Sequence, residues 1–119
     1  MGRGIDNSYS HYSVLSNITI SSPGGHGINN TGIQCIISGN NIRGMRSEYY
    51  GINSEGNNCV ITSNITDGGN GIRALGAAPI VKNNKILNAA APGYELSDTS
   101  ETDLGKGYNR FCYNMSAYA

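Results

Sequence analysis

The chain has 119 residues, and its eight basic side chains balance eight acidic ones, so its formal net charge at neutral pH is zero. Charged residues make up only 13% of the composition, which leaves no excess of Lys and Arg for binding nucleic-acid phosphates or an anionic membrane surface. Glycine, asparagine and serine number 17, 16 and 13, a load typical of turn-rich or disordered chains, whereas 14 isoleucines in periodic positions favour a folded, β-rich protein.

The chain is organised by a repeat whose units begin at a Gly-Ile dipeptide. Four of these dipeptides recur at spacings of 23, 24 and 20 residues, and the last three units that they begin align over eleven positions without a gap. The four units start at Gly4-Ile5, Gly27-Ile28, Gly51-Ile52 and Gly71-Ile72. A period of this length indicates a solenoid, because one unit is too short to bury its own apolar face and has to stack on its neighbours.

Each unit is expected to contain three short strands separated by Gly/Asn turns, with no helix. The first strand starts at the Gly-Ile dipeptide. A second glycine then precedes an apolar run, which in the three aligned units is Cys35–Ile37, Cys59–Ile61 and Pro79–Val81. A third strand is expected near an asparagine, because an isoleucine follows that asparagine by one or two places in every unit.

The recurring asparagine predicts a structural ladder. Its members are Asn17, Asn40, Asn64 and Asn84. Stacked rungs place equivalent residues about 4.8 Å apart, so each amide can donate to the carboxamide oxygen of the next while its backbone adopts the left-handed turn conformation. By the same reasoning Cys35 and Cys59 share one inward column, where we expect them to act as small apolar fillers rather than to form a disulfide.

These motifs resemble the right-handed parallel β-helix of the pectin-lyase-like superfamily, which includes bacteriophage tailspikes. The resemblance covers roughly residues 4 to 88. It implies an all-β fold, namely a short right-handed parallel β-helix of about four rungs with three parallel sheets. It also implies faces that bind or cleave polysaccharides and, for the phage proteins, assembly as a homotrimer. The superfamily's enzymes usually have many more rungs than this chain.

The repeats end near residue 88, which divides the chain into β-helix rungs at 1–88 and a C-terminal segment at 89–119. That segment concentrates large side chains, namely Tyr94, Tyr108, Phe111, Tyr113, Met115 and Tyr118. We expect it to be a cap or a trimer-interface segment, because a bare rung end exposes backbone groups and the apolar bore. The first unit begins at Gly4, so the opposite end is expected either to continue a longer chain or to stack on a partner.

Two acidic residues are the candidates for catalysis. Asp67 opens a turn one rung after the long turn that contains Glu48. Turns that follow equivalent strands of neighbouring rungs lie side by side, so Glu48 and Asp67 could form the acid and the nucleophile or base of a glycosidase. The alternative interpretation is that both are solvated turn residues.

The candidate ligand-binding residues lie mostly in the longest insertion between units. They are Arg43, Arg46, Tyr49 and Tyr50, together with Arg73 beyond the next turn. Aromatic rings stack on sugar faces while guanidinium groups bond hydroxyls, which favours a glycan contact. The insertion could equally pack against a neighbouring subunit, and Arg73 could be an ordinary surface charge.

No cofactor or metal site is expected from the sequence. His11 and His26 stand alone near turns, where we expect surface positions, and the chain has no phosphate-binding glycine loop. No apolar run is long enough to cross a membrane, and the start lacks a secretory signal.

These features and the resemblance together predict a phage tailspike or tail-fibre segment. It would be made in the host cytoplasm, assemble as a homotrimer in the virion and contact a bacterial surface polysaccharide, with other virion proteins as further partners and without binding nucleic acid or membrane. The first alternative is a polysaccharide lyase or glycoside hydrolase of the pectin-lyase-like type, which the short chain and the lack of a dense acidic cluster disfavour. The second is a purely structural virion decoration or tail-assembly protein.

Overall fold

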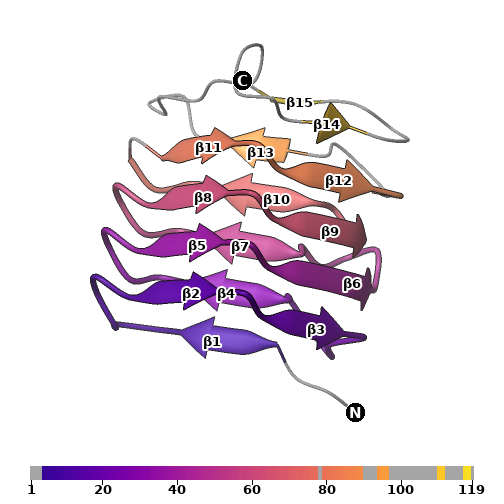
Figure 1. Cartoon of the computed structure of the whole chain (residues 1–119), viewed down its shortest axis with the longest axis horizontal. Coiled ribbons are helices and arrows are strands. Elements are labelled where there is room, and N and C mark those ends of the chain that lie inside the picture. The colour runs from indigo at the N-terminus through magenta and orange to yellow at the C-terminus, as the bar shows by residue number, and fades with distance from the viewer. Residues whose placement is uncertain (1–3, 78, 90–93, 97–109, 112–116, 119) are drawn as a thin grey trace.

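The computed structural model describes residues 4–77, 79–89, 94–96, 110–111 and 117–118, and Figure 1 shows their arrangement. Every regular element in these ranges is a β-strand, and the strands stack into a β-solenoid of about four turns with three parallel sheets. The predicted all-β solenoid is therefore confirmed. Most of the expected C-terminal cap or interface segment, 89–119, lies outside the described residues.

Each turn of the solenoid contributes one strand to each of three sheets, which we call A, B and C. Sheet A contains β1 (Ile5–Asn7), β4 (Ile28–Asn30), β7 (Ile52–Ser54), β10 (Ile72–Ala74), β13 (Tyr94–Leu96) and β15 (Ala117–Tyr118). Sheet B contains β2 (Val14–Ser16), β5 (Ile36–Ser38), β8 (Val60–Thr62) and β11 (Ile80–Lys82). Sheet C contains β3 (Thr19–Ser21), β6 (Asn41–Met45), β9 (Ile65–Gly68), β12 (Lys85–Leu87) and β14 (Arg110–Phe111).

The Gly-Ile repeat sets the register of sheet A. Ile28 pairs with Ile5 on one side and with Ile52 on the other, and Ile52 pairs with Ile72. At three of the four positions the glycine before the isoleucine leaves no room for a Cβ atom, which would meet backbone oxygens of the next rung at Gly4 and side chains of sheet C at Gly27 and Gly51. A Cβ atom on Gly51 would lie 2.5 Å from Cγ2 of Thr66 on sheet C, closer than two carbon atoms can approach.

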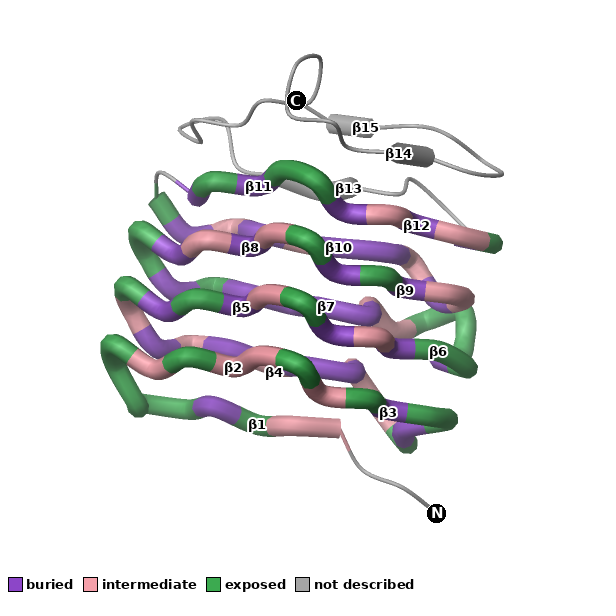
Figure 2. The backbone as a smooth tube through the Cα atoms, in the orientation of Figure 1, coloured by how far each residue is buried: buried purple, intermediate pink, exposed green. Residues whose placement is uncertain are grey.

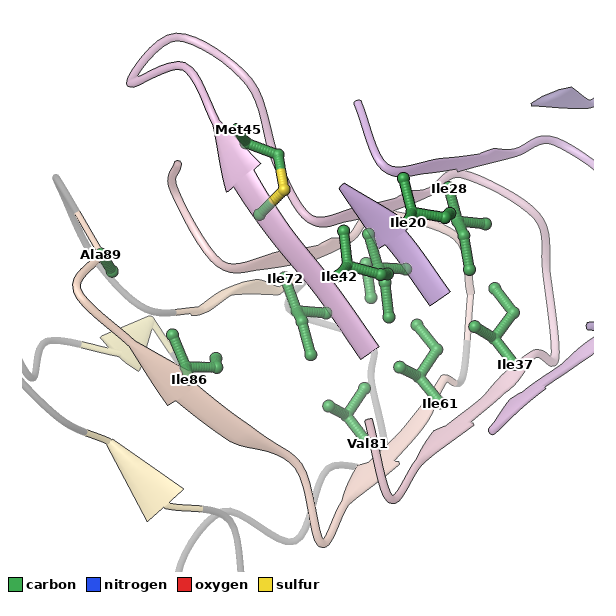
Figure 3. Packing of buried hydrophobic residues seen from close by; sticks show 12 residues of the cluster. Ile20, Ile28, Ile37, Ile42, Met45, Ile61, Ile72, Val81, Ile86 and Ala89 are labelled. Atoms are coloured by element: carbon green, nitrogen blue, oxygen red, sulfur yellow. The ribbon is translucent and has the colours of Figure 1, made fainter. Parts of the chain in front are cut away.

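The core is a column of aliphatic side chains inside the bore, to which all three sheets contribute. Along most strands of sheets B and C a buried residue stands between residues that are more exposed (Figure 2), as a period of two requires, whereas all three residues of β7 in sheet A are buried. The buried cluster, most of which Figure 3 labels, consists of Ile20, Ile28, Ile37, Ile42, Met45, Ile52, Ile61, Ile72, Ala74, Val81, Ile86 and Ala89. Thr66 interrupts the inward column of sheet C, and within the described residues its buried hydroxyl has no hydrogen-bond partner.

Asparagine side chains form a ladder at the corner between sheets B and C. Nδ2 of Asn40 donates to Oδ1 of Asn64 at 2.9 Å, and Nδ2 of Asn64 donates to Oδ1 of Asn84 at 3.0 Å. The second hydrogen of each amide bonds a carbonyl oxygen of the preceding rung, as from Asn64 to Ile37 at 2.9 Å. All three amides are buried, so the ladder satisfies polar groups that water cannot reach.

Asn17 does not belong to this ladder, contrary to the sequence prediction. The backbone amide of Ile18 donates to Oδ1 of Asn40 instead, at 3.0 Å. The shift arises because the turn between β1 and β2 spans residues 8–13, one residue more than the 31–35 turn of the next rung. Asn17 therefore stacks on Gly39 in a separate column of left-handed residues, with φ of 57° and 69°. The left-handed position precedes the ladder asparagine rather than coinciding with it.

A second polar column runs inside the bore at the end of sheet A. Nδ2 of Asn7 donates to Oδ1 of Asn30 at 2.7 Å, and Nδ2 of Asn30 donates to Oγ of Ser54 at 3.1 Å. The two buried thiols, both free, belong to this network, because Nδ2 of Asn30 lies 3.4 Å from Sγ of Cys59. Cys35 and Cys59 thus fill space as expected and in addition receive amide hydrogens.

Candidate functional site

The outer face of sheet A carries a row of polar side chains, one from each of four rungs. Because the strand residues alternate, the residue after each inward isoleucine points outward. These outward residues are Asp6, Asn29, Asn53 and Arg73, which stand in register on β1, β4, β7 and β10; Asn53 is itself only 3% exposed. We call them the polar row.

Hydrogen bonds along the first three rungs hold the polar row in place. Nδ2 of Asn53 donates to Oδ1 of Asn29 at 2.8 Å, and Nδ2 of Asn29 lies 3.5 Å from Oδ1 of Asp6. Flanking side chains add two contacts, because Oγ of Ser8 donates to Asp6 at 2.6 Å and Nδ2 of Asn53 lies 3.3 Å from Oε2 of Glu55, while within the described residues the buried Oδ1 of Asn53 has no hydrogen-bond partner. The row is thereby preorganised before any ligand arrives.

Three rings flank the polar row where the chain enters sheet A. His26 precedes β4, while Tyr49 and Tyr50 end the turn before β7. The His26 ring lies edge-on to Tyr49, with centroids 5.3 Å apart, and tilted against Tyr50 at 5.8 Å. We call these three residues the aromatic cluster. The guanidinium carbon of Arg73 lies 5.4 Å from the centroid of the Tyr50 ring, which links the cluster to the polar row through a cation–π contact.

The environment of His26 favours the neutral imidazole. Its Nδ1 accepts the backbone N–H of Tyr50 at 3.0 Å, which leaves Nε2 to carry the proton of the neutral ring. Burial lowers the pKa of His26 below its usual 6.5, and the positive charge of Arg73 acts in the same direction. His26 therefore offers a hydrogen-bond donor without a positive charge at neutral pH.

A pocket of about 370 Å³ opens where the polar row meets the aromatic cluster. It is lined by Gly4, Ile5, Asp6, Gly24, Gly25, His26 and Asn29. The lining thus combines a carboxylate, an imidazole and a carboxamide with glycines that leave the backbone accessible. This volume lies at the lower end of the range of small-molecule sites, which suits a ligand of the size of one sugar ring.

The structure brings together three of the five residues predicted to bind a ligand. Tyr49, Tyr50 and Arg73 all lie at the outer face of sheet A. Arg43 instead points outward from β6 on sheet C, where its Nη2 donates to Oδ1 of Asn41 at 3.2 Å. Arg46 is exposed in the turn before β7, and its carbonyl oxygen accepts the N–H of Tyr49 at 3.0 Å.

The two predicted catalytic carboxylates lie on different elements. Glu48 is exposed in the turn that follows β6. Asp67 lies on β9 in sheet C, in register with Arg43, and its Oδ1 accepts a hydrogen bond from Nδ2 of Asn88 at 2.8 Å. Within the described residues no hydrogen bond joins Glu48 to Asp67, and their role as a catalytic pair stays a prediction.

Sequence reasoning missed Asp6, Asn29 and Asn53, and it placed His26 alone at the surface. The signal was present in the repeat, since every Gly-Ile dipeptide is followed by a residue with a polar side chain. The contacts of His26 carried no comparable signal, because they depend on a turn one rung away in the sequence.

Among the residues that the structure places, no group of three or more His, Cys, Asp or Glu side chains could hold a metal ion. The same part of the chain has no helix long and apolar enough to span a membrane. In comparisons with known proteins, no family model, curated protein or solved structure matched the chain.

Proposed function

We propose that this chain is a polysaccharide-binding β-solenoid and that the outer face of sheet A is its binding surface. The observation that carries the proposal is the contact between the aromatic cluster and the preorganised polar row. A pyranose ring has apolar C–H faces that stack on aromatic rings and hydroxyls that bond carboxylates and carboxamides. Both kinds of group stand side by side on this face.

The shape of the surface favours a chain of sugars over a single one. The polar row repeats once per rung, so its four members span about 14 Å along the solenoid axis. Their side chains differ, with a carboxylate at Asp6, amides in the middle and a guanidinium at Arg73. A ligand that lies along these four rungs meets opposite charges at Asp6 and Arg73, which favours one direction of binding.

The biological setting that we propose is a phage virion. This setting rests on the resemblance of the repeats to the β-helices of phage tailspikes. In that setting the polysaccharide would be a bacterial surface glycan, and the chain would assemble as a homotrimer. Fold and setting alone do not name an activity, so the glycan proposal depends on the residues of sheet A.

Binding is tested with purified bacterial capsular polysaccharides and lipopolysaccharide O-chains in calorimetric or array measurements. For a glycan that binds, Tyr50→Leu should weaken binding at least tenfold, because leucine keeps an apolar group but removes the ring face. Asn29→Ala should weaken binding to a similar degree. Arg46→Ala is the matched control from the same turn as Tyr50 and should bind like the wild type.

Two results would contradict the proposal. One is a glycan whose affinity is unchanged in both Tyr50→Leu and Asn29→Ala. The other is release of oligosaccharides by the wild type that is lost in Glu48→Gln and in Asp67→Asn, which would establish the hydrolase instead.

A further inference from the structure

Among the described residues that line the pocket beside the polar row, one side chain is charged at neutral pH. This side chain is the carboxylate of Asp6 on β1, in the first rung of the solenoid (Figure 1). The other polar side chains of the lining are those of His26, whose pKa is lowered by burial, and Asn29, and both are neutral at pH 7. We call this cavity the Asp6 pocket.

Neutral donors orient the Asp6 carboxylate and leave one of its oxygens open. Oγ of Ser8 donates to Oδ1 of Asp6 at 2.6 Å, and Nδ2 of Asn29 lies 3.5 Å from the same oxygen. Oδ1 of Asn29 accepts a hydrogen bond from Asn53 at 2.8 Å, which leaves Nδ2 of Asn29 to face Asp6. In the part of the chain that the structure describes, Oδ2 of Asp6 receives no hydrogen bond, and the residue is exposed. A ligand can therefore reach an oriented carboxylate oxygen.

The cation of the polar row, Arg73, is too far from Asp6 to neutralise it. Their strands are separated by β4 and β7, so the two residues stand about 14 Å apart along the solenoid axis. That separation exceeds the screening length of about 8 Å at physiological ionic strength. The residues between them, Asn29 and Asn53, carry no charge. The pocket therefore attracts a positive charge on a ligand and repels a negative one.

We infer that the Asp6 pocket binds a sugar with a free amino group, whose ammonium ion donates a hydrogen bond to Oδ2 of Asp6. This inference rests on the proposed glycan-binding function and names the class of sugar that the first rung takes. A hydrogen bond between an ammonium ion and a carboxylate is stronger than one between neutral groups. A parent hexose lacks the charge. An N-acetylated sugar also lacks it and adds bulk in a cavity of about 370 Å³.

The state of His26 fits the same class of ligand. Its Nδ1 accepts the backbone N–H of Tyr50 at 3.0 Å, so Nε2 of the neutral ring carries the proton and can donate to a hydroxyl or ring oxygen. A charged imidazolium in the lining would compete with the ammonium ion of the ligand for Asp6. The pocket instead combines one anionic acceptor with neutral donors, which complements a sugar that carries one ammonium ion and several hydroxyls.

The test compares glucosamine, galactosamine and mannosamine with their parent hexoses and their N-acetyl forms. Each sugar is titrated at pH 7 into the isotope-labelled full chain, and the shifts of the backbone amide signals give the Kd. For at least one ring, the wild type should bind the amino sugar threefold or more tighter than the parent hexose and the N-acetyl form, roughly the effect of an exposed ion pair. The signals that shift should include those of Gly25 and Asn29 in the pocket.

Asp6→Asn isolates the contribution of the charge. Asparagine keeps the shape of the side chain and an acceptor for Ser8 but cannot attract an ammonium ion. The preference for the amino sugar should disappear in this variant, whereas the affinity for the parent hexose, which is the matched control, should change less than about twofold. Circular dichroism verifies that the variant folds. A second measurement needs no variant, because added NaCl screens the ion pair and should reduce the preference of the wild type.

Four results would overturn the inference: no binding of any of the three amino sugars up to about 100 mM, equal affinity of the wild type for amino sugar and hexose, a preference that persists in folded Asp6→Asn, or a preference that NaCl does not reduce. The proposed function survives these results if a polysaccharide without amino sugars loses affinity in Tyr50→Leu and Asn29→Ala. If the affinity of every bound polysaccharide depends on neither residue, the proposed function fails whatever the monosaccharide preference.

Discussion

The carboxamide oxygen of Asn64 accepts two hydrogen bonds from Asn40, one from its side-chain Nδ2 at 2.9 Å and one from its backbone N–H at 3.0 Å. The same pair of bonds recurs between Asn84 and Asn64, both at 3.0 Å. One side chain thus ties the turn of its own rung to the turn of the preceding rung. The ladder fixes the stacking register at a corner where the sheets themselves are interrupted.

Replacing Asn64 with alanine should lower the free energy of unfolding by about 2–3 kcal/mol, because it removes the buried acceptor of the backbone N–H and one Nδ2 hydrogen of Asn40 and the buried donor to the carbonyl oxygen of Ile37. Urea denaturation followed by circular dichroism measures the change. The matched control is Asn41→Ala, since Asn41 points outward and its Oδ1 accepts only an exposed contact from Arg43. Its loss should cost less than about 0.5 kcal/mol. Equal losses in the two variants would show that the ladder contributes nothing specific.

In the column that contains Asn17, replacing the asparagine should have little effect on stability, whereas replacing the glycine of the next rung should be destabilising. Asn17 has φ of 57°, a conformation that glycine adopts without strain, and Gly39 occupies the equivalent place in the next rung. Asn17→Gly should therefore change stability by less than about 0.5 kcal/mol. Gly39→Ala should destabilise by about 1 kcal/mol or more, because φ is 69° and a Cβ there would lie 2.9 Å from Oδ1 of Asn17. If Asn17→Gly lowered the free energy of unfolding as much as Asn64→Ala does, Asn17 would have to be a member of the ladder.

The buried hydroxyl of Thr66 is the clearest defect in the bore. Thr66 is fully buried where the neighbouring rungs of sheet C place Ile42 and Ile86, and within the described residues its Oγ1 has no partner. Thr66→Val keeps the shape and removes the unpaired polar group, so it should stabilise the protein by about 1 kcal/mol or more. Thr19→Val, on the exposed outer face of sheet C, is the control and should be nearly neutral. If Thr66→Val were less stable than the wild type, the hydroxyl of Thr66 would have to form a hydrogen bond in the folded protein.

The repeat in the sequence predicts most of the fold, but it predicts fewer of the contacts on the outer face of sheet A. The Gly-Ile dipeptides that begin the units predict the register, because their isoleucines pair with one another along sheet A and three of their glycines leave no room for a side chain. The misplacement of Asn17 shows the limit, since one additional residue in the 8–13 turn moved its column without disturbing the local motif. The face of sheet A was harder to predict, because the contact of His26 with Tyr50 forms only when rungs stack. Side chains brought together by stacking leave no pattern within a single unit.

The acid sensitivity of the fold should depend on His26. Burial, with a contribution from Arg73, lowers the pKa of His26 in the folded state, whereas Glu55 opposes this shift more weakly and the unfolded chain keeps a value near 6.5. Between the two pKa values the unfolded state binds more protons than the folded state, so stability increases with pH in this window. The stabilisation is complete above pH 6.5 and is lost as the pH falls through the lower, folded-state pKa. Urea midpoints at pH 7.5 and 5.5 should therefore differ in the wild type.

The matched variant for this prediction is His26→Asn. Asparagine offers Oδ1 as an acceptor for the backbone N–H of Tyr50 but does not titrate, so this variant should keep most of the hydrogen bond and lose the His26 part of the pH dependence. His11 and the carboxylates are present in both proteins, and their contributions cancel in the comparison. The wild type should lose more stability than His26→Asn between pH 7.5 and 5.5. Identical pH profiles would mean that the His26 imidazole is as accessible to protons in the folded state as in the unfolded chain, and the aromatic cluster would then be too open to hold a neutral donor against a sugar.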